Sequence, residues 1–275
     1  MSIIAPILFA IFAWWFSTGL LLFVVRLIDR REGFPSEPKF MQYCSVIGSL
    51  PVFIFGLYLF HNTLNSLSPT SIYLAFISAL IIWGWLEFAF MCGVVTGTNS
   101  GSCVSQLSGW ERFRLSFLTI CYSEIAIGVT FMWLITFGIS GQNYFGLLAF
   151  SVLFFARLSA KLNIFFGVPF INFEFLPSPI QHIATYFCVR KVTAMFPISI
   201  TLMTCAAFFF LGQLFNSTDN GTSGHIGYSL VLALTILALV EHWFMVLPLP
   251  DSKLWTWMLP GNSNLVEKPR SQTVI

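Results

Sequence analysis

Residues 144–160 read YFGLLAFSVLFFARLSA, and this stretch decides how many times the chain crosses a membrane. It is apolar as far as Arg157, but it is short for a spanning helix, which needs about 20 residues. It reaches full length only if Arg157 extends its guanidinium to the membrane interface, as long basic side chains do. The rest of the chain must therefore decide whether this stretch crosses.

Six further runs are apolar and long enough to span a bilayer. Hydrophobic residues make up 57% of the chain and charged residues only 9%, whereas a soluble domain carries about 25% charge. This composition predicts an all-α, polytopic helical membrane protein whose main solvent is lipid. In chain order, the seven candidate spans are Ile3–Val25, Cys44–Phe60, Ile72–Val95, Leu115–Phe137, Tyr144–Ala160, Ala194–Phe215 and Ile226–Leu247.

The placement of the 13 Lys and Arg residues favours seven spans over six. With the fifth span, all 13 lie on one side of the membrane and none on the other. Without it, they divide six against seven. Because cytoplasmic loops are enriched in Lys and Arg, the first arrangement is strongly preferred. We therefore predict seven transmembrane helices, with the N-terminus outside and the C-terminus in the cytoplasm.

The chain is expected to form one transmembrane helical bundle over residues 1–260. Two segments are predicted to lie in the membrane surface. One, near 161–180, is apolar but broken by glycine and proline, and the other, 251–258, carries two tryptophans beside Lys253. Residues 261–275 are polar and are predicted to form a disordered tail.

Three carboxylates, those of Glu87, Glu124 and Glu241, fall inside the predicted spans. At a rise of 1.5 Å per residue, they lie about 12, 13 and 9 Å from the inner ends of their helices. His242 follows Glu241 directly. Ionisable groups in lipid are costly and are usually functional or paired. These four residues therefore predict one polar site in the inner half of the membrane, either a metal or pigment ligand set or a proton relay.

The alternative is that each glutamate separately helps to hold neighbouring helices together, either protonated or hydrogen-bonded to a neighbouring helix. A di-iron bundle would need Glu-x-x-His, which places both ligands on one helix face, but Glu241 and His242 are adjacent. The sequence thus specifies no metal, and both interpretations stay open. The candidate hydrogen-bonding neighbours are Ser123, Tyr122, Trp83 and Trp85.

A group of aromatic and basic residues is predicted on the inner face. Trp110, Arg112 and Arg114 precede the fourth span, and Arg157 and Lys161 end the fifth. Arg157 and Lys161 are four residues apart and so share one helix face. These five residues could form a docking surface for a partner or an anionic head group. Ordinary anchoring of helix ends at the membrane interface would give the same pattern.

Several classes of protein lack support. A retinal protein needs a lysine in its last span, and no predicted span has one in its interior. Walker A and G-x-S-x-G motifs are missing, which leaves nucleotide hydrolysis and elbow-type serine hydrolysis without a basis. We expect no nucleic-acid partner.

Five short motifs stand in a fixed order along the chain. They are WWFSTG at 14–19, WGWLE at 83–87, GWERFR at 109–114, FFARLSAKLN at 154–163 and EHWFMVLPLPD at 241–251. Together they resemble the PuhE-type photosynthetic complex assembly proteins of purple phototrophic bacteria. The resemblance extends from about residue 10 to residue 258.

The resemblance implies a multi-pass protein of the bacterial inner (intracytoplasmic photosynthetic) membrane. It implies a non-enzymatic assembly factor for the reaction centre and the core light-harvesting complex, or a factor that adjusts bacteriochlorophyll supply or insertion. The implied partners are photosynthetic complex subunits or other assembly factors, and bacteriochlorophyll or a precursor is the implied ligand class. The family supplies no catalytic residues.

Two other functions follow from the residues alone. One is an intramembrane pigment-handling or metal-dependent enzyme built on Glu87, Glu124, Glu241 and His242. The other is a small proton- or cation-coupled transporter that uses the same carboxylates.

Overall fold

A computed structural model describes residues 3–31, 39–104, 107–173, 176–217 and 221–248. Seven helical spans in it are long and apolar enough to cross a membrane, which confirms the predicted helical fold. The second span is made of two consecutive helices, α2 and α3. The elements are α1 (Ile4–Arg31), α2 (Lys39–Gly48), α3 (Leu50–Thr63), α4 (Pro69–Met91), α5 (Gly109–Leu118), α6 (Cys121–Gly138), α7 (Phe145–Phe166), the 3-10 helix η2 (Ser178–Tyr186), α8 (Met195–Asn216) and α9 (Gly221–Phe244).

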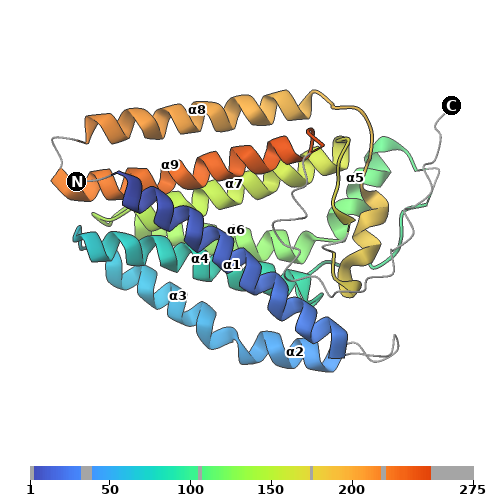
Figure 1. Cartoon of the computed structure of the whole chain (residues 1–275). Coiled ribbons are helices and arrows are strands. Elements are labelled where there is room, and N and C mark those ends of the chain that lie inside the picture. The colour runs from blue at the N-terminus through green and yellow to red at the C-terminus, as the bar shows by residue number, and fades with distance from the viewer. Residues whose placement is uncertain (1–2, 32–38, 105–106, 174–175, 218–220, 249–275) are drawn as a thin grey trace.

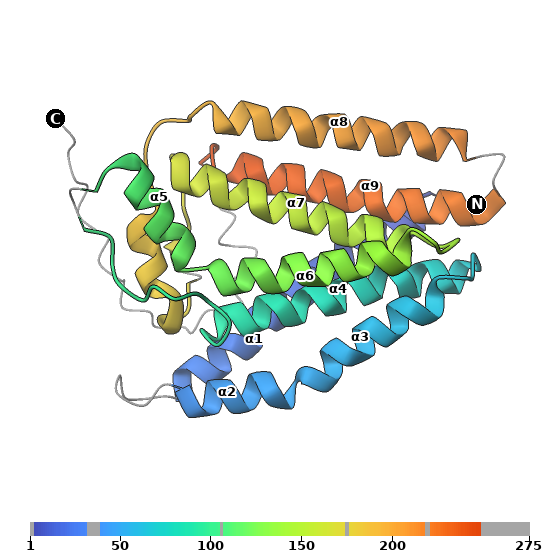
Figure 2. The ribbon, with the colours of Figure 1, turned by 180° about the vertical axis from the view of Figure 1, so that it is seen from behind.

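The long helices lie side by side, and α1 crosses them obliquely (Figure 1). Both views place α8 at one edge of the bundle beside α9, and α3 at the other edge beside α4 (Figure 2). The short elements α5 and η2 gather at one end, which we call the α5 end. The main core is formed by α4, α7 and α9, whose side chains Phe76, Phe150 and Leu230 are fully buried.

The second span is broken where the sequence places a glycine and a proline. Pro51 lies in the first turn of α3, where its missing N–H leaves no helical hydrogen bond unmade. The indole of Trp85, on α4, donates a hydrogen bond of 3.1 Å to the hydroxyl of Ser49 at the break. The bend between α2 and α3 is thus stabilised by a neighbouring helix.

The predicted fourth span, Leu115–Phe137, begins six residues too early. The chain forms α5, breaks at Thr119 and Ile120, and starts α6 at Cys121. A distant loop stabilises this break: the carbonyl of Thr96 accepts from the amide of Ser123, and the amide of Asn99 donates to the carbonyl of Leu118. Backbone groups freed at the break are therefore satisfied by residues outside the span.

The predicted fifth span, Tyr144–Ala160, forms α7 and continues to Phe166. It ends at Gly167, whose φ of 132° is a conformation that side chains disfavour. The first part of the surface segment predicted near 161–180 is therefore helix, and its last residues begin η2. The predicted surface segment 251–258 and the tail 261–275 lie outside the described residues.

A compact cap covers the α5 end of the bundle. It is formed by α5, η2 and the loop that carries Asn99 and Gly101. The guanidinium of Arg112 donates to the carbonyls of Phe165 and Tyr186, so one side chain joins α5, α7 and η2. The buried phenol of Tyr186 accepts from the side-chain amide of Asn99 at 3.0 Å and donates to the carbonyl of Gly101 at 3.2 Å. The cap is thus an ordered structure, held mainly by side chain to backbone hydrogen bonds.

His182 in η2 should make the stability of this cap depend on pH. Burial lowers the pKa of His182, and the hydrogen bonds to the backbone of Pro179 and Asn99 oppose that shift only in part. An unfolded cap therefore binds a proton more readily than the folded cap. The contribution of the neutral His182 side chain to the stability of the cap should be fully present above the ordinary histidine pKa of about 6.5. It should be lost progressively as the pH drops below that value.

Hydrogen exchange of peptides covering residues 178–187, at about pH 7.5 and about pH 5.5, would test this expectation. After correction for intrinsic rates, we expect lower protection in acid for the wild type and a smaller difference for His182→Gln. Equal pH dependence in the two proteins would show that another group is responsible.

Candidate functional site

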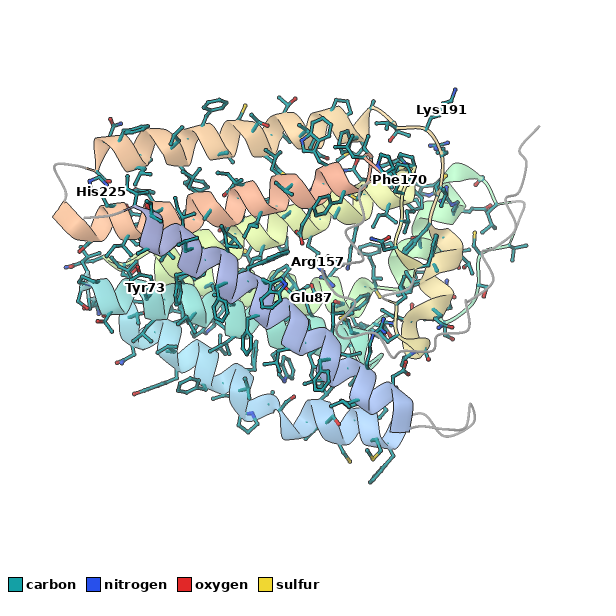
Figure 3. The ribbon with its side chains drawn as sticks, in the orientation of Figure 1. Tyr73, Glu87, Arg157, Phe170, Lys191 and His225 are labelled. Carbon is teal, nitrogen blue, oxygen red and sulfur yellow. The ribbon has the colours of Figure 1, made fainter. Side chains whose placement is uncertain are left out.

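An ion-pair cluster inside the bundle joins three helices around Arg157 of α7. The Nε of Arg157 lies 2.6 Å from Oε1 of Glu87 on α4, and its Nη1 lies 3.2 Å from Oε1 of Glu124 on α6. The side chains of Arg157 and Glu87 are only 10% and 17% exposed. Figure 3 shows the Arg157–Glu87 pair in the bundle interior, between His225 at one end and Lys191 at the other.

Lys161 adds a second cation on the same face of α7. Its Nζ lies 2.5 Å from the Oε1 of Glu124 that Arg157 also contacts. Arg157 further donates from Nη2 to the hydroxyl of Ser123 at 3.2 Å. Glu124 lies in the first turn of α6, where the helix dipole favours a negative charge. The charges of two carboxylates and two basic side chains therefore balance within one cluster.

Aromatic rings line the cluster on α4. Trp83, Glu87 and Phe90 are spaced so that they share one face of this helix. The Phe90 ring centroid lies 5.2 Å from the Arg157 guanidinium carbon and 4.7 Å from the Lys161 nitrogen. Cations over ring faces are attracted by the ring quadrupole, most strongly where water is excluded. The Phe90 ring thus adds a favourable contact to both cations.

His242 belongs to a different polar group, between α7, α8 and α9. Its Nδ1 lies 2.8 Å from the carbonyl of Ala238 and its Nε2 lies 3.0 Å from the hydroxyl of Ser159. Because a carbonyl can only accept, Nδ1 carries the proton and Nε2 accepts from Ser159. Asn163 completes the group by donating to the Ser159 carbonyl and to the Ser199 hydroxyl.

The structure therefore does not unite the four residues predicted as one polar site. Glu87 and Glu124 meet through Arg157. His242 instead contacts Ser159, which lies two residues after Arg157 on α7 and therefore about 200° around that helix from it. The side chain of Glu241 is exposed, and within the described residues it has no ion pair or side-chain hydrogen bond. The depth predicted for Glu124 also changes, since α6 begins only three residues before it.

The five residues predicted as a docking surface divide into two groups. Trp110, which is 73% exposed, and Arg114 lie on the surface of α5. Arg112 is turned into the cap, and Arg157 and Lys161 into the ion-pair cluster. The expectation that Arg157 reaches the membrane interface is wrong, because two carboxylates on neighbouring helices hold it inside.

Ser123 and Trp83 are the residues among the predicted hydrogen-bonding neighbours that lie at the cluster, but both contact Arg157 rather than a glutamate. The acid–base pairing itself was not predicted. A signal for it was present: two cations four residues apart in an apolar helix, and two carboxylates at similar depth elsewhere.

The cluster is suited to holding helices together in lipid. Within the described residues, no group of three or more His, Cys, Asp or Glu side chains is placed to hold a metal ion. Glu87 and Glu124 are instead neutralised by basic side chains, which offsets the cost of placing charge in a poorly solvated site. The fold and the cluster thus define a polytopic membrane protein with an internal ionic link between α4, α6 and α7.

Comparison with known proteins places this chain in a family. It belongs to the family described as "Protein of unknown function (DUF3623)", whose profile matches residues 1–265. A relative from Rhodobacter capsulatus is 44% identical over 251 residues, covering 91% of this chain and 89% of that protein. It is described as an uncharacterized 30.4 kDa protein in the puhA 5′ region. No solved structure matches.

Proposed function

We propose that this protein is a non-enzymatic, PuhE-type assembly factor for the photosynthetic reaction centre and its core light-harvesting complex. The observation that carries the proposal is the 44% identical relative encoded in the puhA region, a photosynthesis gene region. The protein would act in the intracytoplasmic photosynthetic membrane, with its N-terminus outside and its α5 end in the cytoplasm. The one-sided placement of all Lys and Arg residues supports this orientation.

The surface of the bundle is compatible with such a role. Rows of large apolar side chains lie exposed on the peripheral helices, for example Phe12 and Phe16 on α1 and Phe208 and Phe209 on α8. In a membrane, these faces would contact lipid or the helices of a partner. The internal ion pairs would keep the bundle rigid while its outer faces bind nascent subunits or bacteriochlorophyll.

The alternative site chemistries gain no support from the contacts. Both ring nitrogens of His242 are already hydrogen-bonded, so ligation of a pigment magnesium would first require Ser159 to move. A proton path along Glu87 and Glu124 would have to break ion pairs of 2.5 to 3.2 Å.

Deletion of the gene in its phototrophic host tests the assembly role. We expect weaker near-infrared bands of the reaction centre and core antenna per cell, and slower growth in light, because fewer complexes would be completed. Reintroduction of the wild-type gene should restore both. Total bacteriochlorophyll, extracted and measured separately, would distinguish a defect in pigment supply from one in insertion. Unchanged bands with normal phototrophic growth would refute the proposal.

A further inference from the structure

Of the three glutamates inside the predicted spans, one has no cation beside it within the described residues. Glu87 and Glu124 are paired with Arg157 and Lys161, whereas the exposed Glu241 has no charged partner within the described residues. It lies in the last turn of α9, three residues before Phe244, or about 4.5 Å from the end of the helix. A carboxylate at this depth, facing lipid, is costly unless something neutralises it.

The neighbours of Glu241 fix the direction in which it points. His242 faces α7, where it contacts Ser159, and the ring of Trp243 packs edge-on against Phe196 of α8, with 5.4 Å between centroids. Successive residues of an α-helix are about 100° apart. Glu241 and Trp243 therefore lie about 160° apart around the axis. Glu241 is thus turned away from α8, and α1 is among the other helices that pack on α9.

The side of α9 that carries Glu241 becomes more exposed towards the C-terminal end of the helix. Residues Leu230, Leu234, Leu237 and Glu241 lie close to one line on the helix surface, because they are spaced by three or four positions. Leu230 and Leu234 are buried, Leu237 is half-buried, and Glu241 is exposed. This gradient locates an uncovered face on the last two turns of α9.

The path of α1 explains the gradient. The first half of α1, including Ala10, packs in the same apolar cluster as Leu230 of α9. Its second half, including Val25, packs instead in a separate cluster with Phe88 of α4 and Val46 of α2. Figure 1 shows α1 crossing α9 near one end and lying well apart from it at the α5 end.

We infer that this face of α9, from Leu237 to the end of the helix and centred on Glu241, docks a transmembrane helix of a partner protein that carries a Lys or Arg within one turn of its own membrane end. The inference deepens the proposed assembly function and rests on it. Charge complementarity selects the partner: Glu241 supplies a carboxylate that has no cation beside it within the described residues, and the apolar surface beside it accepts a helix. The same pairing already joins α7 to α4 and α6 within this chain.

The test uses the tagged, full-length protein expressed in the phototrophic host and extracted in mild detergent. A photo-crosslinking residue replaces Leu237, on the proposed face, or the exposed Met132 on α6 as a position control. We expect a crosslink from position 237, but not from 132, to a membrane protein with a basic residue at the stated depth. Glu241→Gln should lower recovery of that protein about threefold or more. Glu111→Gln, at an exposed carboxylate on α5, should not.

Charge reversal identifies the pairing. Glu241→Lys should abolish recovery, and a Glu in place of the partner's basic residue should restore it. Because Glu241 has no ion pair or side-chain hydrogen bond to lose within the described residues, its variants should melt like the wild type. Crosslinks to residues 249–275, to a second copy of this chain, or to a helix without the basic residue would overturn the inference.

The two proposals fail in different ways. If the deletion strain loses its near-infrared bands while the Glu241→Gln strain keeps them and full partner recovery, the inference is wrong and the assembly function stands. If the deletion strain is normal, the assembly function itself is wrong.

Discussion

Arg157→Met should lower the free energy of unfolding by about 3 kcal/mol or more, because it leaves Glu87 without a cation inside the bundle. The lost contact is short, with 2.6 Å between Nε and Oε1, and both side chains are largely buried. Titration with a denaturing detergent in mixed micelles would measure the change. Lys161→Met should cost less, since Lys161 is more exposed and Glu124 would keep its contact with Arg157.

The matched control is the double variant Arg157→Met, Glu87→Gln. It removes the charge that the single variant strands, and it leaves the Lys161–Glu124 pair in place. We therefore expect it to be more stable than Arg157→Met alone, with a coupling energy of about 0.5 to 3 kcal/mol. Equal stability of the single and double variants would mean that Glu87 is not the charge that Arg157 neutralises.

The number of long apolar helices was predictable because it depends on quantities that sequence carries directly. Hydropathy located the long apolar runs, the one-sided basic residues favoured the stretch around Phe150 as one more span, and the structure has seven helical spans of sufficient length. The breaks were harder to predict. Pro51 marks the one between α2 and α3, but the break before Cys121 has no proline and depends on hydrogen bonds from the distant loop at Thr96 and Asn99.

The candidate site was predicted in part, because depth can be calculated from sequence while helix rotation cannot. Glu87 and Glu124 do meet, but through Arg157, which had been assigned to the membrane interface. An arginine near a helix end can reach outwards or inwards, and the choice depends on acids presented by other helices. Rotation likewise explains Glu241: packing of His242 and Trp243 on α7 and α8 turns it outwards.

Gly97→Ala should also be strongly destabilising, because Gly97 lies against the break between α5 and α6. An added Cβ would lie 2.0 Å from the carbonyl oxygen of Leu118 and 2.6 Å from the carbonyl carbon of Thr119. Both atoms belong to the backbone, so no side-chain rotation can relieve the clash. We expect a cost of about 1 to 3 kcal/mol in the same detergent titration.

Gly109→Ala provides the control, since a Cβ at this first residue of α5 meets nothing within 4 Å. It should be neutral or slightly stabilising, because alanine loses less backbone entropy than glycine in a helix. If both variants lowered the free energy of unfolding by a similar amount, the cause would be the loss of glycine flexibility rather than the close approach at Gly97.

The effect of Gly97→Ala should reach the ion-pair cluster. The loop beside Gly97 accepts the amide of Ser123 through the carbonyl of Thr96, and Glu124 follows Ser123 in the first turn of α6. A displaced break would therefore shift Glu124 relative to Arg157. In a double-mutant cycle, the coupling between Arg157→Met and Glu124→Gln should shrink in the Gly97→Ala background and persist in the Gly109→Ala background. Unchanged coupling would mean that α6 is positioned by its packing on α7 alone.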